Sequence, residues 1–382
     1  NIGRIDWEPY IASLFTRIQK SFNLPVLYKK ISVVSKLQPL DPGILSRWIV
    51  ASCGKGSSTQ KYLEQLFKAL ESYYHPANVG GHTYKLMNFL IRVTQSFVRR
   101  VHKERYAKPK WGNIVAEECK LTDDDIESFV RGIQPVILNA MYSNSMMTAG
   151  PLQCLATLSP TIVIPPLIER LYGAFDTMTE PHKLTASLNS VVAVARSLVH
   201  PGASYKEGPT HVIPLLMLSL PGIDPNDIRK AALTFQFIST FCTLVPIVDS
   251  SSSITMGGIN VDLSEEEKMI CGQSSQFEDF VAQFLDMCFN FIESSTYEHT
   301  REEVSSSDHR SSKEDTLKNS GMASTFSAII THASTPIQDI ALKKVQKFIQ
   351  GKILEIKVSG KIAASLCRCL VRVSPAKSLK AF

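Results

Sequence analysis

The sequence predicts an all-α protein, an α-solenoid of HEAT/armadillo-like helical repeats. Two observations lead to this fold class. Apolar residues recur with helical spacing along most of the 382 residues, and a unit of two helices joined by a proline-containing turn recurs at an interval in the forties. Repeats of that length are typical of an α-solenoid, because one helix pair cannot bury its apolar face without neighbouring pairs.

The repeated unit is a short apolar helix that opens with Ile-Pro, a polar turn, and a longer amphipathic helix. Pro165 and Pro214 occupy matching positions 49 residues apart, and Ala186 and Ala232 match at an offset of 46. The copies, the third of them weaker, are 162–171 with 179–199, 211–220 with 224–241, and 322–333 with 337–349.

The prolines indicate where the short helices begin. Proline is tolerated in the first turn of a helix, because the N–H that it lacks would have no partner there. We therefore expect the helices of the first two copies to start close to Pro165 and Pro214, with the sharp corners that stacked helix pairs need.

Upstream of these repeats the pattern stays helical but shows no clean period. The predicted helices are 41–54, 58–74, 81–106 and 122–142. In the third of them, Leu86, Leu90, Val93, Phe97 and Val101 form the apolar stripe that is expected to face inward.

Four segments follow from these patterns. They are a basic, irregular helical-repeat segment (1–160), HEAT-like repeats (161–292), a disordered serine-rich acidic insertion (293–320), and further HEAT-like repeats that continue beyond the chain (321–382). The insertion carries eight Ser, seven Asp or Glu and four Lys or Arg, with only three apolar residues. Such a composition does not bury a core and predicts a mobile loop.

The net charge of +6 conceals an asymmetry between the two ends of the sequence. Residues 1–120 hold 19 Lys and Arg against 8 Asp and Glu, a net of +11, whereas the remainder holds 22 against 27, a net of −5. The excess of positive charge in residues 1–120 predicts an acidic or anionic partner for this part of the chain. The alternative is that these charges lie on solvated helix faces.

Eight scattered cysteines form no disulfide framework and favour a reducing, intracellular setting. The uncharged run at 231–248 is interrupted by polar residues, so it predicts a buried helix of a soluble protein and no membrane span. Because the sequence starts at Asn1 and ends in "SPAKSLKAF", we interpret it as a fragment of a longer protein.

No catalytic constellation is found, so we expect no enzyme. The stretch "CGKGSST" (53–59) lacks the glycine spacing of a phosphate loop, and it reads as an interhelical turn. Cys367 and Cys369 point about 200° apart on a helix, which disfavours a shared metal ion. No metal site is predicted.

One basic patch is a candidate anion site. The stretch "RRVHKERYAKPK" (99–110) has six Lys or Arg among twelve residues. Arginine forks suit phosphate and carboxylate groups. The candidate residues are Arg92, Arg99, Arg100, Lys103 and Arg105. The alternative is a solvated helix face whose positive charges pair with nearby glutamates.

Several uncommon stretches resemble the family of large single-chain HEAT-repeat proteasome activators. They are "GRIDWEPY" (3–10), "YYHPANVGG" (73–81), "VRRVHKERYAKP" (98–109), "VIPPLIERLY" (163–172), "MTEPHKLTASL" (178–188), "EGPTHVIPLLMLSLPGIDPND" (207–227), "FQFISTFCTLVPIVD" (235–249) and "FIESSTYEHTREE" (291–303). The resemblance covers essentially the whole chain.

This resemblance implies a scaffold segment of a dome that caps the α ring of the core (20S) proteasome and opens its gate independently of ATP and ubiquitin. The family is linked to degradation of acetylated histones, bound through regions outside this chain, and to DNA repair in nucleus and cytoplasm. No cofactor is required, although family members hold inositol phosphates in basic openings. No membrane or direct nucleic-acid binding is expected. The alternative function is a generic HEAT-repeat adaptor or transport receptor for an acidic partner.

Overall fold

The structure is a computed structural model of the chain. It describes residues 2, 5–22, 24, 41–54, 56–78, 80–108, 115–177, 180–200, 205–254, 263–302, 311–351 and 359–382. Part of the segment predicted to be disordered, 303–310, lies outside these ranges.

The described residues form helices and no β-strand, which confirms the all-α fold class. One isolated bridge pairs Ile247 with Ala333. The α-helices are α1 (Glu8–Ser21), α2 (Pro42–Ser52), α3 (Thr59–Leu70), α4 (Thr83–Tyr106), α5 (Asp123–Ala140), α6 (Ser145–Leu158), α7 (Pro160–Asp176), α8 (Pro181–Val199), α9 (Val212–Ser219), α10 (Ile228–Leu244), α11 (Glu265–Gln273), α12 (Phe277–Glu302), α13 (Ser311–His332), α14 (Thr335–Gly351), α15 (Ser359–Val373) and α16 (Pro375–Ala381). Short 3₁₀ turns are η1 (Glu71–Tyr74), η2 (Glu117–Cys119), η3 (Gly208–His211), η4 (Leu220–Gly222), η5 (Ser251–Ile254) and η6 (Ser274–Gln276).

The helices divide into two compact units. Unit 1 comprises Asn1–Arg170 and Asn189–Ser197, and unit 2 comprises Leu171–Leu188 and Leu198–Phe382. The division at 160 that the sequence suggested stays a prediction.

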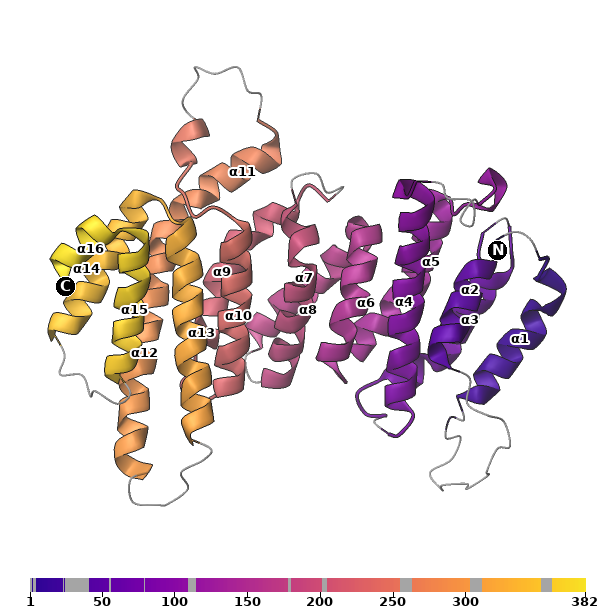
Figure 1. Ribbon diagram of the computed structural model, residues 1–382, viewed down its shortest axis with the longest axis horizontal. Helices are drawn as coiled ribbons and strands as arrows, with labels where there is room; N and C mark the ends of the chain where they lie inside the picture. The colour runs from indigo at the N-terminus through magenta and orange to yellow at the C-terminus, as the bar shows by residue number, and fades with distance from the viewer. Residues whose placement is uncertain are drawn as a thin grey trace. The chain divides into compact units, whose positions relative to one another are not determined.

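In unit 1 the helices pack in two alternating layers (Figure 1). Helices α2, α4 and α6 follow one another in one layer, and α1, α3 and α5 in the other. Phe97 of α4 stacks on Phe129 of α5, with ring centroids 3.6 Å apart, and joins the layers. This alternation is the packing of a helical-repeat solenoid, in which each helix contacts mainly its neighbours.

Unit 2 repeats the same arrangement. Helices α10, α13 and α15 form one layer, while α9, α12 and α14 form the other (Figure 1). Phe289 of α12 stacks on Phe348 of α14 with centroids 4.1 Å apart, and Phe235 of α10 meets Phe284 and Phe291 of α12 edge-on. Large aromatic side chains thus fill the space between the layers.

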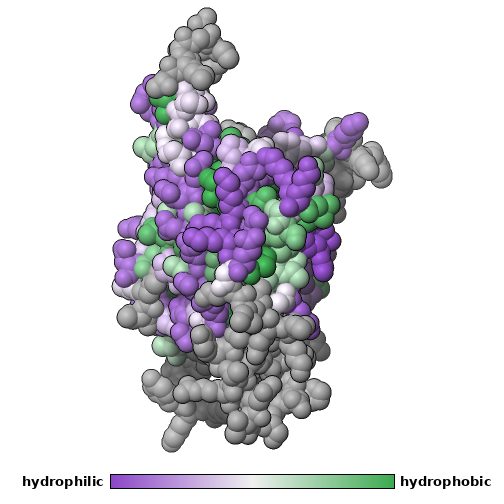
Figure 2. Space-filling model, turned by 90° about the vertical axis from the view of Figure 1, so that its left-hand side faces the viewer, coloured by the Kyte–Doolittle hydropathy of each residue, from purple (hydrophilic) through white to green (hydrophobic). Residues whose placement is uncertain are grey.

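Seen from the side of α14 and α16, the surface of unit 2 is mostly hydrophilic, with small hydrophobic areas between (Figure 2). The helix predicted from the uncharged run at 231–248 is α10, and it packs against α13 inside unit 2. Within the described residues, no helix is both long and apolar enough to span a membrane.

Local sequence signals account for several helix starts. The side chain of Asp41 accepts a hydrogen bond from the Gly43 N–H at 2.9 Å and caps α2. Thr122 and Asp125 form a reciprocal capping box at the start of α5. The four upstream helices predicted from the sequence correspond to α2, α3 with η1, α4 and α5. Side-chain acceptors at these ends satisfy N–H groups that have no helical partner.

The expected start of the helix at Pro165 is wrong. Helix α7 begins at Pro160, so Pro165 and Pro166 lie inside it. A proline within a helix leaves the carbonyl four residues earlier without its backbone donor. For Pro166 that carbonyl belongs to Ile162, and the Gln134 amide of α5 donates to it at 2.8 Å instead. By contrast, Pro214 lies in the first turn of α9, as predicted.

The insertion predicted over 293–320 also needs correction at both ends. Helix α12 extends to Glu302 and α13 begins at Ser311, so twenty of the 28 residues are helical. Composition alone missed this extension. Adding a residue to an existing helix gains one hydrogen bond without repeating the unfavourable nucleation step, so a packed helix can extend into polar sequence.

Candidate functional site

Helix α4 carries all five residues of the predicted anion site. Its apolar stripe is buried as expected, with Leu86, Leu90, Val93, Phe97 and Val101 each at most 5% exposed. Helical geometry then directs the remaining positions outward or to the flanks of the stripe. The five basic residues do not all share one environment.

Arg100 points into the protein, which corrects its assignment to the anion site. Its side chain is only 5% exposed. The guanidinium donates to the carbonyls of Val50 and Cys53 at 2.5 and 2.9 Å, and to the Cys119 carbonyl at 2.7 Å. Its Nε also donates to Glu104 at 2.7 Å. Four of its five N–H groups donate inside unit 1, and its burial keeps the guanidinium away from a ligand in solvent.

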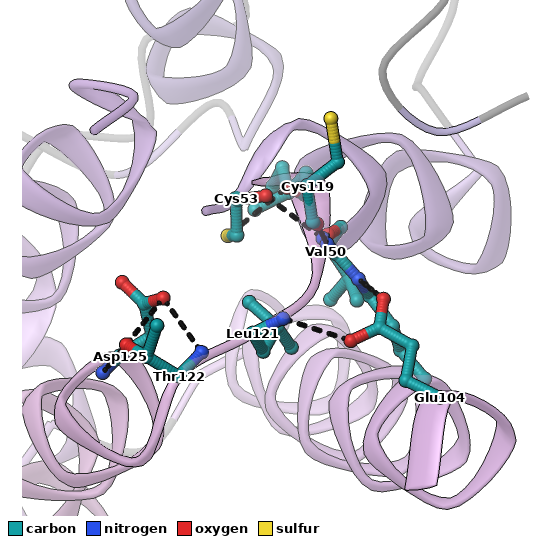
Figure 3. Close-up of polar contacts among 9 residues, drawn as sticks. Val50, Cys53, Glu104, Cys119, Leu121, Thr122 and Asp125 are labelled. Carbon is teal, nitrogen blue, oxygen red and sulfur yellow. Dashed lines mark hydrogen bonds and ion pairs between the residues drawn. The ribbon is translucent and has the colours of Figure 1, made fainter. Parts of the chain in front are cut away.

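Glu104 completes this internal network. Its second carboxylate oxygen accepts the Leu121 N–H at 2.9 Å, beside the Thr122–Asp125 capping box at the start of α5 (Figure 3). The carboxylate is 4% exposed, as buried as its cationic partner. A buried charge is tolerated when it is paired and its remaining hydrogen-bonding positions are satisfied.

Sequence reasoning missed this network, although a signal was present. Arg100 lies three residues after Phe97 and seven after Val93, which places it on the inward stripe. Glu104 follows one turn later, at the spacing of an intrahelical ion pair. An arginine on a predicted apolar stripe, with a glutamate four residues on, indicates a buried pair.

Arg105 is also engaged. It forms an ion pair with Asp123 in the acidic first turn of α5, and its side chain is 38% exposed. The pair links the end of α4 to the start of α5. An anion would have to compete with the Asp123 carboxylate, so Arg105 is a poor candidate for the site.

Arg92, Arg99 and Lys103 remain, and we call these three residues the basic face. All three are exposed, and none makes an ion pair with another residue that the structure describes. Their positions advance by seven and then four residues, or roughly 10 and 6 Å along the helix axis. Exposed Lys85 lies seven residues before Arg92 and extends the row.

The neighbouring helix adds no carboxylate to the basic face. Helix α6 packs against α4 and contains no charged residue between Ser145 and Leu158. On α6, burial raises the pKa of the Cys154 thiol, and the positive charge of Arg99 on α4 lowers it. The positive potential of the basic face is therefore not neutralised from this side.

The part of the chain that the structure describes contains no group of three or more His, Cys, Asp or Glu that could hold a metal ion. Its cysteines are free thiols. Burial raises the pKa of Cys53 to about 12, well above neutral pH, with a smaller opposing effect of Arg100. A thiol with a raised pKa is protonated and weakly nucleophilic.

Alternating helical layers define a helical-repeat protein of the solenoid class. Residues 63–382 match the family described as proteasome activator complex subunit 4, mid HEAT repeats region. The chain belongs to the proteasome activator complex subunit 4 family, a family of HEAT-repeat scaffolds.

The relatives support this assignment over the whole sequence. The chain is 47% identical to proteasome activator complex subunit 4 of Xenopus laevis and 48% identical to that of Homo sapiens, in each case over its full length. It is 27% identical to proteasome activator subunit 4 of Arabidopsis thaliana over 66% of its residues. The chain spans 21% of the length of the first two relatives.

Proposed function

We propose that this chain is a scaffold segment of a proteasome activator that caps the α ring of the core proteasome and opens its gate independently of ATP and ubiquitin. The observation that carries the proposal is the full-length similarity to proteins named proteasome activator complex subunit 4. Because the chain spans about a fifth of those relatives, the activity belongs to the longer protein.

The physical role of the segment within that activator is to hold stacked layers of helices in place. Buried aromatic contacts such as Phe97–Phe129 and Phe289–Phe348 resist sliding between layers. The Arg100–Glu104 network ties α4 to the end of α2 and to the approach to α5. These features suit a scaffold, whose task is to place distant surfaces and not to perform chemistry.

We extend the proposal to the cellular role of the longer protein. It acts in the nucleus and cytoplasm, in the degradation of acetylated histones and in DNA repair, with histones bound outside this segment. Neither a membrane nor a nucleic acid is a direct partner of the segment. Membership of the proteasome activator complex subunit 4 family supports this role.

The basic face is proposed to bind a multiply charged anion, an inositol phosphate in particular, when the longer protein is assembled. Arg99 and Lys103 are one helical turn apart, so one polyphosphate could contact both. Arg92 lies farther along the helix and would add long-range attraction. No cofactor is required for the scaffold role.

Co-sedimentation of the full-length protein with purified core proteasome tests the main proposal. The expected result is a stable complex without ATP, together with faster hydrolysis of a fluorogenic peptide. A matched reaction with ATP and its analogue should give the same rate. If the protein neither sediments with the proteasome nor accelerates hydrolysis, but retains an acidic cargo protein, the adaptor function replaces the activator function.

A further inference from the structure

A shallow polar recess of about 470 Å³ lies in unit 1, away from the basic face. It is lined by Lys68 of α3, Glu71 and Ser72 of η1, His75 and Asn78 of the following turn, and Asn139 of α5. Glu71 and Asn139 are half-buried, whereas the other four are exposed.

The hydrogen bonds of the recess leave it rich in acceptors. The Asn139 amide nitrogen donates to Glu71 Oε1 at 3.2 Å, and the Asn78 amide nitrogen donates to the Ser72 carbonyl at 2.6 Å. Each amide nitrogen uses one of its two N–H groups in these bonds, and the amide oxygens of Asn78 and Asn139 accept from no residue described, so both oxygens can accept from a ligand. The second oxygen of Glu71 makes no hydrogen bond with the residues described.

The helix ends around the recess also favour positive charge. Asn139 is in the last turn of α5, and α3 runs into η1 beside it. Carbonyl groups at a helix C-terminus carry partial negative charge. The same end of α5 already receives one guanidinium, because Arg170 donates to the Leu138 carbonyl at 3.1 Å and lies over the Tyr142 ring.

We propose that this recess binds the guanidinium group of an arginine side chain in a peptide segment of a partner. Glu71 supplies the charge, and the amide oxygens of Asn78 and Asn139 accept the outer N–H groups. Guanidinium has five donors in a planar fork, which matches several acceptors better than a compact ammonium does. A divalent metal is a poor fit, since Glu71 is the recess's sole carboxylate.

The rim restricts which peptides fit. His75 Nδ1 accepts the Ala77 N–H at 3.2 Å, so its Nε2 is the nitrogen left to donate outward. Lys68 is a second donor on the rim. Both can donate to a peptide carbonyl, and the Lys68 ammonium repels further cations, so the arginine should be flanked by neutral or acidic residues. The inference goes beyond the proteasome proposal, and its test requires no proteasome.

The test is saturation-transfer NMR of short peptides with the full-length protein. The probe is acetyl-Ala-Arg-Ala-amide, compared with the same peptide containing citrulline, the neutral isostere, or lysine. We expect the arginine peptide to bind at least fivefold more tightly than either. Glu71→Gln, which keeps the size of the side chain but removes its charge and one acceptor oxygen, should weaken binding of the arginine peptide at least fivefold.

Glu64→Gln is the matched control, because Glu64 is exposed on α3 and does not line the recess. It removes the same charge and should leave the affinity unchanged. Thermal unfolding of both variants shows whether the fold is intact. Equal binding of the citrulline or lysine peptide, or undiminished binding by a folded Glu71→Gln protein, overturns the proposal.

Discussion

Arg100 and Glu104 stand one turn apart on α4 and form a buried ion pair, with Nε and Oε1 2.7 Å apart. Each partner also binds backbone outside α4. Arg100 donates to the carbonyls of Val50, Cys53 and Cys119, and Glu104 accepts the Leu121 N–H. The pair therefore fixes the positions of two connecting segments relative to one helix.

Arg100→Met should destabilise the fold strongly. It would leave the Glu104 charge buried without its cationic partner and the Cys53 and Cys119 carbonyls without the Arg100 donor, a loss of about 3–5 kcal/mol. Arg99→Met, the exposed neighbour, should change the free energy of unfolding by less than about 0.5 kcal/mol. Urea denaturation of the two variants measures the difference. Similar midpoints would show that the network contributes little.

Pro166 leaves the Ile162 carbonyl without a helical donor, and the Gln134 amide donates to this carbonyl instead. Gln134→Leu removes that donor and should destabilise the protein by about 1–3 kcal/mol. Pro166→Ala restores a backbone N–H at the position where the helix needs it. In the Gln134→Leu background, Pro166→Ala should therefore recover most of the lost stability.

A double-mutant cycle of Gln134 and Pro166 measures this coupling by chemical denaturation. Strictly additive effects of the two substitutions would mean that the Gln134 amide does not replace the missing helical hydrogen bond.

Charge reversal on the basic face should weaken anion binding. Arg99→Glu with Lys103→Glu is expected to reduce the affinity of the full-length protein for inositol hexakisphosphate at least tenfold, or about 1.4 kcal/mol. The control is Lys20→Glu with Lys61→Glu, two exposed lysines on α1 and α3 that lie off the basic face. Calorimetry measures both. If the folded Arg99→Glu, Lys103→Glu protein binds with unchanged affinity, the basic face is a solvated surface and not an anion site.

The stability of unit 2 should depend on pH through His211. Its imidazole lies between two phenols, with Tyr172 Oη 3.2 Å from Nδ1 and Tyr205 Oη 3.4 Å from Nε2. Burial lowers the pKa of His211 below its ordinary value of 6.5, and nearby Glu207 opposes this. A lowered folded-state pKa means that the unfolded chain takes up the proton first.

The stabilising contribution of neutral His211 is thus present above pH 6.5 and is lost as the pH falls through that value toward the folded pKa. We expect wild type to lose more stability than His211→Gln between pH 7.5 and 5. Thermal unfolding across this range measures both slopes. Parallel curves for the two proteins would contradict the prediction.

The sequence predicted the helices well because their signals are local. The stripe from Leu86 to Val101 and the cap at Asp41 depend only on residues a few positions apart. The start of α7 was misplaced because the acceptable position of Pro166 depends on Gln134, 32 residues earlier in the sequence. No local pattern reveals a replacement donor from another helix.

The candidate site was predicted less well, because charge counts do not say which way a side chain points. Arg99 and Arg100 are adjacent in sequence but face about 100° apart on the helix, one into solvent and the other into unit 1. The recess around Glu71 was not predicted, since its lining joins α3, η1 and α5, and Asn139 is more than sixty residues from the others.

The packing of α10 against α13 sets an order in which these helices fold during synthesis on the ribosome. The buried Thr325 hydroxyl donates to the Phe235 carbonyl at 3.0 Å, across 90 residues of sequence. At synthesis rates of about 5–20 residues per second, Thr325 of α13 is synthesised roughly 5–20 s after Phe235 of α10. Helix α12 emerges earlier and covers Phe235 with Phe284 and Phe291. Until α13 is synthesised, the face of α10 that α13 later covers stays exposed.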